Sequence, residues 1–177
     1  MQTLPLSWRP GSGGLVASIA DARMLRLQME APGRAARPVR PLHVTLLRSA
    51  SMAPLVDVLG REATALCASL PAFPAVRLGT RLHEATRPPH PRKDPPGSRE
   101  PRITWFIVPD DPGPMQAALA RIVDALDAES RRRGGPAFPH PEPDRMFHVS
   151  VFNNRGGDAW RSIGDIGPMD LARSGAD

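Results

Sequence analysis

Two short stretches with the same pattern stand far apart in the chain, and they constrain its fold more than any other feature. One is PLHVTLL at residues 41–47 and the other is MFHVSVF at residues 146–152. Their β-branched and aromatic composition predicts a strand in each case. Side chains two residues apart point to the same face of a strand, so each histidine shares a face with a hydroxyl residue. The intervening Val44 and Val149 are then expected to face a core.

The candidate catalytic residues are therefore His43 with Thr45, and His148 with Ser150. If the two strands lie side by side, two imidazoles and two hydroxyls meet at one point. A histidine pKa near 6.5 allows either ring to act as base or acid near neutral pH, and the hydroxyls can donate hydrogen bonds to phosphate oxygens. This set suits metal-independent cleavage of a phosphodiester beside a ribose 2′-hydroxyl, leaving a 2′,3′-cyclic phosphate. Which histidine is the base stays open.

Each motif taken alone has a simpler explanation. A strand histidine that is hydrogen-bonded on a polar face gives the same pattern, and short motifs often match by chance. The recurrence of the motif, each time inside an apolar stretch and each time closing a similar half of the chain, favours a shared site.

Length and composition narrow the class of protein. A chain of 177 residues is expected to form one domain of two lobes, and it has no apolar run long enough to span a membrane. Residues 1–8 lack the charged start and long apolar stretch that are typical of a secretory signal, so the protein is not expected to be secreted. A single cysteine excludes an internal disulfide and a cysteine-based zinc site. The net charge of +5 comes almost entirely from arginine and favours RNA as partner. A genome rich in Arg, Ala, Gly and Pro codons would explain the same composition.

The two halves of the chain repeat one order of elements: strand, helix, then a strand with the histidine motif. We expect lobes at residues 1–83 and 103–158, joined by a long mobile Pro-rich loop at 84–102, with a loose segment before residue 15. No assignment is made for residues 153–177. The expected strands beside the motifs are 15–19, 75–82 and 103–108, and the expected helices are 21–30, 51–70 and 115–133.

These motifs resemble the 2H phosphoesterase superfamily, which is named for two His-x-Thr/Ser motifs, one in each lobe. The branch that is most similar comprises eukaryotic phosphodiesterases that trim the 3′ end of spliceosomal U6 snRNA. Its first motif resembles residues 42–49, its central strand resembles Trp105-Phe106-Ile107, and its second motif resembles residues 147–158.

The resemblance implies an α+β, two-lobed, pseudo-twofold fold with antiparallel sheets around a central cleft. It implies a monomeric, cofactor-free RNA phosphodiesterase that trims the 3′ end of a small RNA, in the nucleus or otherwise in the cytoplasm. The branch has a tyrosine before its second motif, near the substrate base, whereas this chain has no tyrosine. Phe138 or His140 is expected to provide the stacking surface instead.

Other residues complete the hypothesis. Arg48 and Arg155 follow the two motif strands and are candidate phosphate contacts. His83 and His90 lack a third ligand at metal-binding spacing, so they are expected to be solvated loop histidines. Arg131–Arg133 is interpreted first as a charged helix end. Two alternative functions remain: a cyclic-nucleotide or 2′,5′-oligonucleotide phosphodiesterase of the same superfamily, and a non-catalytic RNA-binding module.

Overall fold

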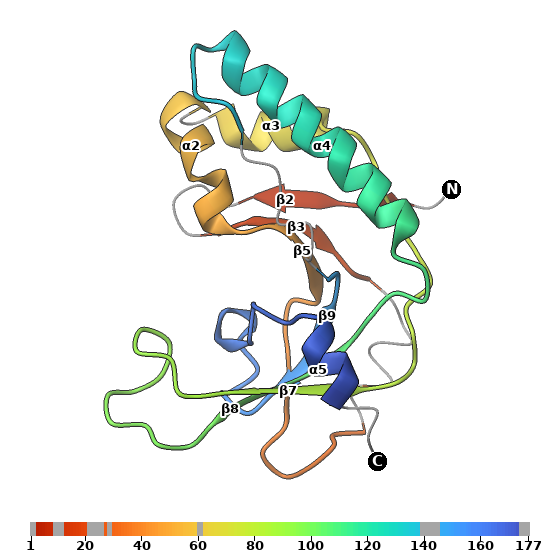
Figure 1. Ribbon diagram of the computed structural model, residues 1–177, viewed down its shortest axis with the longest axis vertical. Helices are drawn as coiled ribbons and strands as arrows, with labels where there is room; N and C mark the ends of the chain where they lie inside the picture. The colour runs from red at the N-terminus through yellow and green to blue at the C-terminus, as the bar shows by residue number, and fades with distance from the viewer. Residues whose placement is uncertain are drawn as a thin grey trace. The chain divides into compact units, whose positions relative to one another are not determined.

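The chain forms two compact units, each assembled from three separate segments (Figure 1). The computed structural model describes residues 3–8, 13–20, 27, 30–59, 62–138 and 146–173. Unit 1 combines residues 1–18, 44–77 and 109–147, and unit 2 combines residues 19–43, 78–108 and 148–177. The fold is of the predicted α+β class with antiparallel strand pairing. The lobes expected from the sequence were continuous in the chain, whereas these units are not.

The strands of unit 1 come largely from the start of the chain. In one sheet β1 (Thr3–Leu4) pairs antiparallel with β6 (Phe73–Pro74). In another, β2 (Leu6–Trp8) pairs with β3 (Leu15–Ser18), which is followed in the strand order by β5 (His43–Leu47). The loose segment expected before residue 15 is therefore wrong for residues 3–8. Strand pairing orders these residues, and the Trp8 side chain, which is 6% exposed, anchors them in the core of unit 1.

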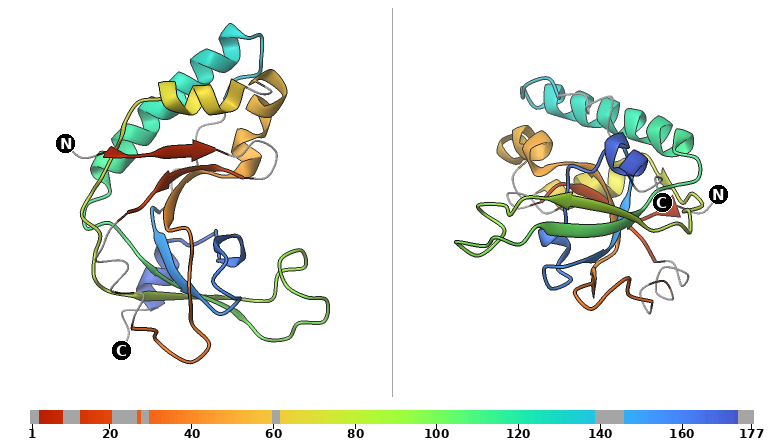
Figure 2. Two further views of the ribbon diagram at one scale, coloured as in Figure 1. Left: turned by 180° about the vertical axis from the view of Figure 1, so that it is seen from behind. Right: turned by 60° about the horizontal axis from the view of Figure 1, so that its bottom comes forward.

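In the part of unit 1 that the structure describes, the helices are α2 (Ser49–Leu59), α3 (Ala63–Ser69) and α4 (Gly113–Arg132). Figures 1 and 2 show α3 and α4 on the same side of β2 and β3. The single helix predicted over 51–70 is thus two helices. The sequence has Gly60 between them, and glycine is a poor helix former.

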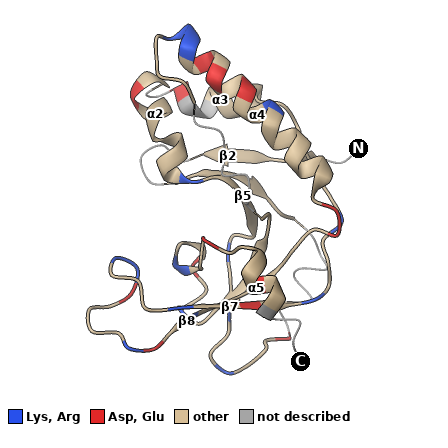
Figure 3. Ribbon diagram, viewed as in Figure 1, with Lys and Arg blue, Asp and Glu red and all other residues tan. Residues whose placement is uncertain are grey.

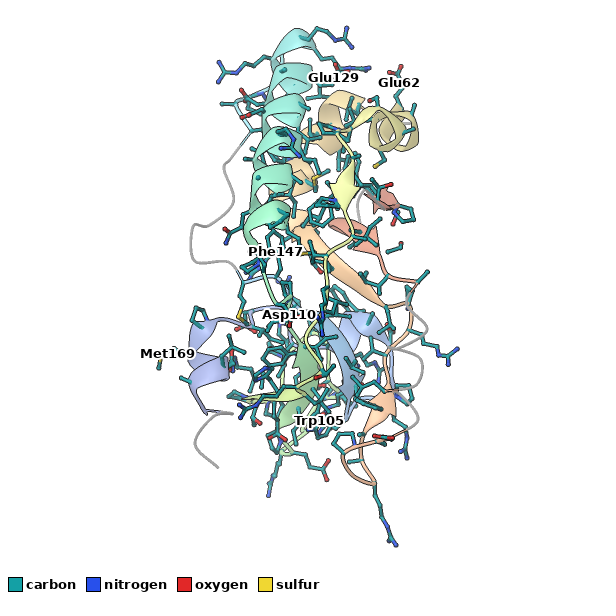
Figure 4. The ribbon with its side chains drawn as sticks, turned by 90° about the vertical axis from the view of Figure 1, so that its right-hand side faces the viewer. Glu62, Trp105, Asp110, Glu129, Phe147 and Met169 are labelled. Carbon is teal, nitrogen blue, oxygen red and sulfur yellow. The ribbon has the colours of Figure 1, made fainter. Side chains whose placement is uncertain are left out.

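The amphipathic pattern of α4 predicted its buried face correctly. Met115, Leu119, Ile122 and Leu126 all lie in the core of unit 1. Pro114 occupies the first turn, where a missing N–H costs nothing. Phe147, labelled in Figure 4, adds to this core through an edge-on contact with the Phe73 ring, with centroids 6.1 Å apart.

Unit 2 is built on four strands: β4 (Arg37–Pro38), β7 (His83–Arg87), β8 (Arg102–Ile107) and β9 (Val149–Asn153). β8 pairs antiparallel with β7 on one side and β9 on the other, and β4 also pairs with β9. The strand predicted over 75–82 is therefore wrong, because the strand begins at residue 83. The strand predicted over 103–108 is confirmed within one residue at each end.

The Pro-rich segment between β7 and β8 is held in place by a buried carboxylate. The Asp94 side chain is 1% exposed, with its oxygens 3.5 Å from Arg102 Nε and 3.1 Å from Arg155 Nε. It also accepts a hydrogen bond from the His90 N–H at 2.6 Å. Lys93 lies over the Trp160 ring, with Nζ 4.4 Å from its centroid. The expected loop at 84–102 is thus shorter, because residues 84–87 belong to β7, and these contacts link it to the rest of unit 2.

The last described part of unit 2 contains a short 3-10 helix, η2 (Ala159–Arg161), and the helix α5 (Pro168–Arg173). Arg87 of β7 holds α5 through two hydrogen bonds to Asp170, at 2.8 and 2.9 Å. Hydrogen bonding to Asp170 raises the pKa of the Arg87 guanidinium above its usual value. The helix expected over 21–30 lies almost wholly outside the described residues. No helix in the described ranges is long and apolar enough to cross a membrane.

Candidate functional site

The first motif has the alternation that its sequence predicts. Along β5, His43 and Thr45 are half-buried, whereas Val44 and Leu46 are 1% and 0% exposed. His43 Nδ1 lies 3.0 Å from the Pro41 carbonyl oxygen. A carbonyl only accepts, so this hydrogen bond assigns the proton to Nδ1 and leaves Nε2 as the proton-accepting atom of the neutral ring.

The second motif repeats this alternation, although its histidine stands one residue before β9 begins. His148 and Ser150 are half-buried, and Val149 and Val151 are fully buried. The His148 ring meets the Phe106 ring edge-on, with centroids 5.8 Å apart.

A β-bulge interrupts β9 directly after Ser150. Phe106 of β8 pairs with Ser150, but its neighbour Trp105 pairs with Phe152, so Val151 is an extra residue. Bulges of this kind are common beside active sites, because they redirect side chains. The sequence contains no signal for this bulge.

Both histidines belong to unit 2, as does Ser150, whereas Thr45 belongs to unit 1. The segment that leads to His43 is hydrogen-bonded to β9. Val39, the residue after β4, donates its N–H to the Val151 carbonyl at 2.8 Å and so continues the pairing of β4 with β9. Arg40 similarly donates to the Gly157 carbonyl at 3.0 Å. The approach to the first histidine therefore runs along the strand that carries the second motif.

Gly157 allows this close approach. Its φ is +80°, and a Cβ there would lie 2.4 Å from the Pro38 carbonyl oxygen. The N–H of Gly157 donates to the side chain of buried Asn153 at 2.9 Å, which fixes the turn after β9. Any side chain at residue 157 would push the segment before His43 away from β9.

The structure places a further histidine, His83, in the same sheet as the second motif. His83 pairs with Phe106, which pairs in turn with Ser150, so the three residues lie in one row across β7, β8 and β9. The His83 ring stacks on Phe106, with centroids 5.5 Å apart and the planes inclined by 29°. Burial, and then the charge of Arg81, lowers the pKa of His83. The expectation of a solvated loop histidine is wrong, because His83 begins a strand.

The four predicted substrate-binding residues have different outcomes. Phe138 belongs to unit 1 and is 3% exposed, so it has no free ring surface for stacking on a base. His140 lies outside the described residues. Arg48 is exposed, just after β5 in unit 1. Arg155 is engaged by Asp94 and donates to the Glu100 carbonyl at 2.6 Å, which weighs against the predicted phosphate contact.

The basic run Arg131–Arg133 is a charged helix end, as predicted, because its arginines pair with acidic residues of the same helix. Arg131 pairs with Asp127, and Arg132 and Arg133 pair with Glu129. These hydrogen bonds, from Arg132 first and then Arg133, lower the pKa of the Glu129 carboxyl to about 2. Figure 4 labels Glu129 on this helix and Glu62, which also pairs with Arg133.

Within the described ranges, no group of three or more His, Cys, Asp or Glu side chains is arranged to hold a metal ion. Comparison with known protein families, with curated proteins and with solved structures finds no match to this chain.

Proposed function

We propose that the protein is a metal-independent phosphodiesterase of the 2H type that cleaves RNA near its 3′ end. One observation carries the proposal. In both motif strands the imidazole and the hydroxyl share the half-buried face, the intervening valine is buried, and both imidazoles belong to the same compact unit. Paired imidazoles and hydroxyls of this kind are what in-line attack by a ribose 2′-hydroxyl requires.

The reaction uses the four side chains in two roles. One imidazole takes the proton of the 2′-hydroxyl, whose oxygen attacks the phosphorus, and the other imidazole gives a proton to the leaving 5′-oxygen. His43 suits the base, since its Nδ1–H is engaged by Pro41 and its Nε2 accepts. Thr45 and Ser150 donate hydrogen bonds to the non-bridging oxygens, where negative charge grows in the transition state. The products are a 2′,3′-cyclic phosphate and a free 5′-hydroxyl.

Turnover of 3′-labelled oligo(U) by matched histidine variants tests the proposal. We expect His43→Ala and His148→Ala each to lose at least about 100-fold in rate, because each removes a proton-transfer group. His90→Ala is the matched control, since His90 lies in the turn between β7 and β8. Full turnover in both motif variants, or RNA binding by a wild type that has no turnover, would contradict catalysis.

Two further measurements separate related activities. Consumption of 2′,3′-cyclic nucleotides or 2′,5′-linked oligonucleotides in preference to oligo(U) would favour the alternative function, a cyclic-nucleotide or 2′,5′-oligonucleotide phosphodiesterase. The rate is expected to follow a bell-shaped pH curve and to be insensitive to EDTA. Loss of activity in EDTA with recovery in zinc would contradict the metal-independent mechanism.

A further inference from the structure

A row of paired residues crosses β9, β8 and β7, from Ser150 of the second motif to the imidazole ring of His83. Directly paired residues of adjacent strands project from the same face of a sheet. His83, Phe106 and Ser150 are paired in this way, so they share a face. Strands lie about 4.8 Å apart, which puts His83 about 10 Å from Ser150 along the row.

The orientation of the His83 ring is set by packing. It lies nearly flat on Phe106, whose other contact in this row is the edge-on ring of His148. The Nδ1 atom of His83 is buried with no hydrogen-bond partner, so hydrogen bonding at that atom does not fix the ring. Phe106 is fully buried, and His83 is half-buried. Of the two stacked residues, His83 is therefore the one that retains exposed surface.

We propose that His83 is the base-stacking platform of the site, where it holds the nucleobase next to the cleaved phosphodiester. This inference rests on the proposed function, because it takes the phosphate to lie at His148 and Ser150. Unstacked bases in RNA are commonly held on aromatic side chains, histidine included. Arg81 adds a positive charge close to His83, which favours an anionic nucleotide. The expected stacking partner Phe138 is buried in unit 1 and does not compete for this role.

His83 is a better platform than proton donor. Burial and Arg81 favour its neutral form, which stacks on a base without carrying charge. Stacking is tolerant of sequence, because every base has a flat face. The expected specificity is therefore for a nucleotide over phosphate alone, with weak preference among bases.

The test compares the binding of adenosine 3′-monophosphate and inorganic phosphate by titration calorimetry. His83→Ala and His83→Gln are expected to weaken nucleotide binding about 5- to 100-fold and to leave phosphate binding unchanged. His83→Phe keeps a flat ring and is expected to retain nucleotide affinity. His90→Ala is the control histidine. With oligo(U), His83→Gln should raise KM and leave kcat near the wild-type value.

The outcomes separate this inference from the function on which it rests. Equal nucleotide binding by wild type, His83→Ala and His83→Gln overturns the platform, even where oligo(U) is cleaved. Nucleotide binding that depends on the ring at residue 83, in a wild type without turnover, supports the platform and overturns catalysis. A wild type that neither binds the nucleotide nor cleaves RNA overturns both. A loss in kcat with KM unchanged would assign His83 to proton transfer and overturn the stacking role.

Discussion

At the scale of single residues, the hydroxyls of the two motifs occupy equivalent positions. Thr45 and Ser150 each follow a histidine by two residues and share its face of the strand. Both are half-buried, so they lie where they can meet a ligand and still be oriented by the fold. Hydroxyls held in this way stabilise charge that develops during a reaction without having to reorganise.

Removal of these hydroxyls is expected to slow the chemical step more than it weakens binding. Thr45→Val and Ser150→Ala keep the shape of each side chain nearly unchanged, and each should reduce kcat about 100-fold with little change in KM. Single-turnover kinetics on oligo(U) measures the effect. Thr86→Val is the matched control, since Thr86 is an exposed hydroxyl residue of β7. A drop no larger than that of the control would remove the hydroxyls from the mechanism.

At the scale of elements, the Pro-rich segment after β7 has no helix or strand propensity to fix its conformation, and a few side-chain contacts hold it in place. Proline restricts the backbone and removes N–H donors, so this segment forms only local turns, such as the hydrogen bond from the Asp94 N–H to the His90 carbonyl at 3.0 Å. Asp94 compensates by pairing with Arg102 at the start of β8 and with Arg155 after β9. The segment is therefore fastened to two strands of unit 2.

Asp94→Asn should destabilise the protein strongly, because it leaves two nearly buried guanidinium groups without their carboxylate. The expected loss is about 3–5 kcal/mol in the free energy of unfolding, measured by urea denaturation. Glu100→Gln removes a carboxylate that is 85% exposed and 3.6 Å from Arg155, and it should cost under about 1 kcal/mol. Equal effects of the two substitutions would mean that the buried pairing does not hold the segment.

At the scale of the whole molecule, the chain passes between its two units several times, and one boundary falls inside β5. Each unit therefore depends on pairing between segments far apart in sequence, such as β4 with β9. The arginines are spread over both units (Figure 3). Several of them pair with acidic side chains, as Arg87, Arg133 and Arg155 do. The net charge of +5 is a property of the chain as a whole.

The salt dependence of oligo(U) binding distinguishes the two explanations of the arginine content. If the positive charge serves RNA binding, log K should fall linearly with log salt, with a slope of about −0.7 for each phosphate neutralised. Fluorescence anisotropy of labelled oligo(U), at salt concentrations from about 50 to about 200 mM, would measure this slope. Arg131→Ala, which loses only a pair at the end of α4, should leave the slope unchanged. A flat plot would leave codon composition as the explanation.

The local pattern of this protein could be predicted from its residues alone. The alternation of His43, Val44 and Thr45, its repetition at His148, and the apolar stripe of α4 all follow from side-chain periodicity, which is a property of the backbone. The α+β class with antiparallel strands, which the family resemblance implied, is also what the structure has.

The tertiary structure alone decided which residues stand beside these motifs. β7 has few strand-forming residues of its own, and it becomes a strand because β8 pairs with it. The signal in the sequence is indirect: the predicted strand that contains residues 103–106 needs a neighbouring strand to pair with, and β7 is that neighbour. That pairing brought His83 to the face of Ser150. Likewise, Phe138 is buried in unit 1 and Asp94 pairs with Arg155. These outcomes depend on contacts between distant segments, which no local pattern encodes.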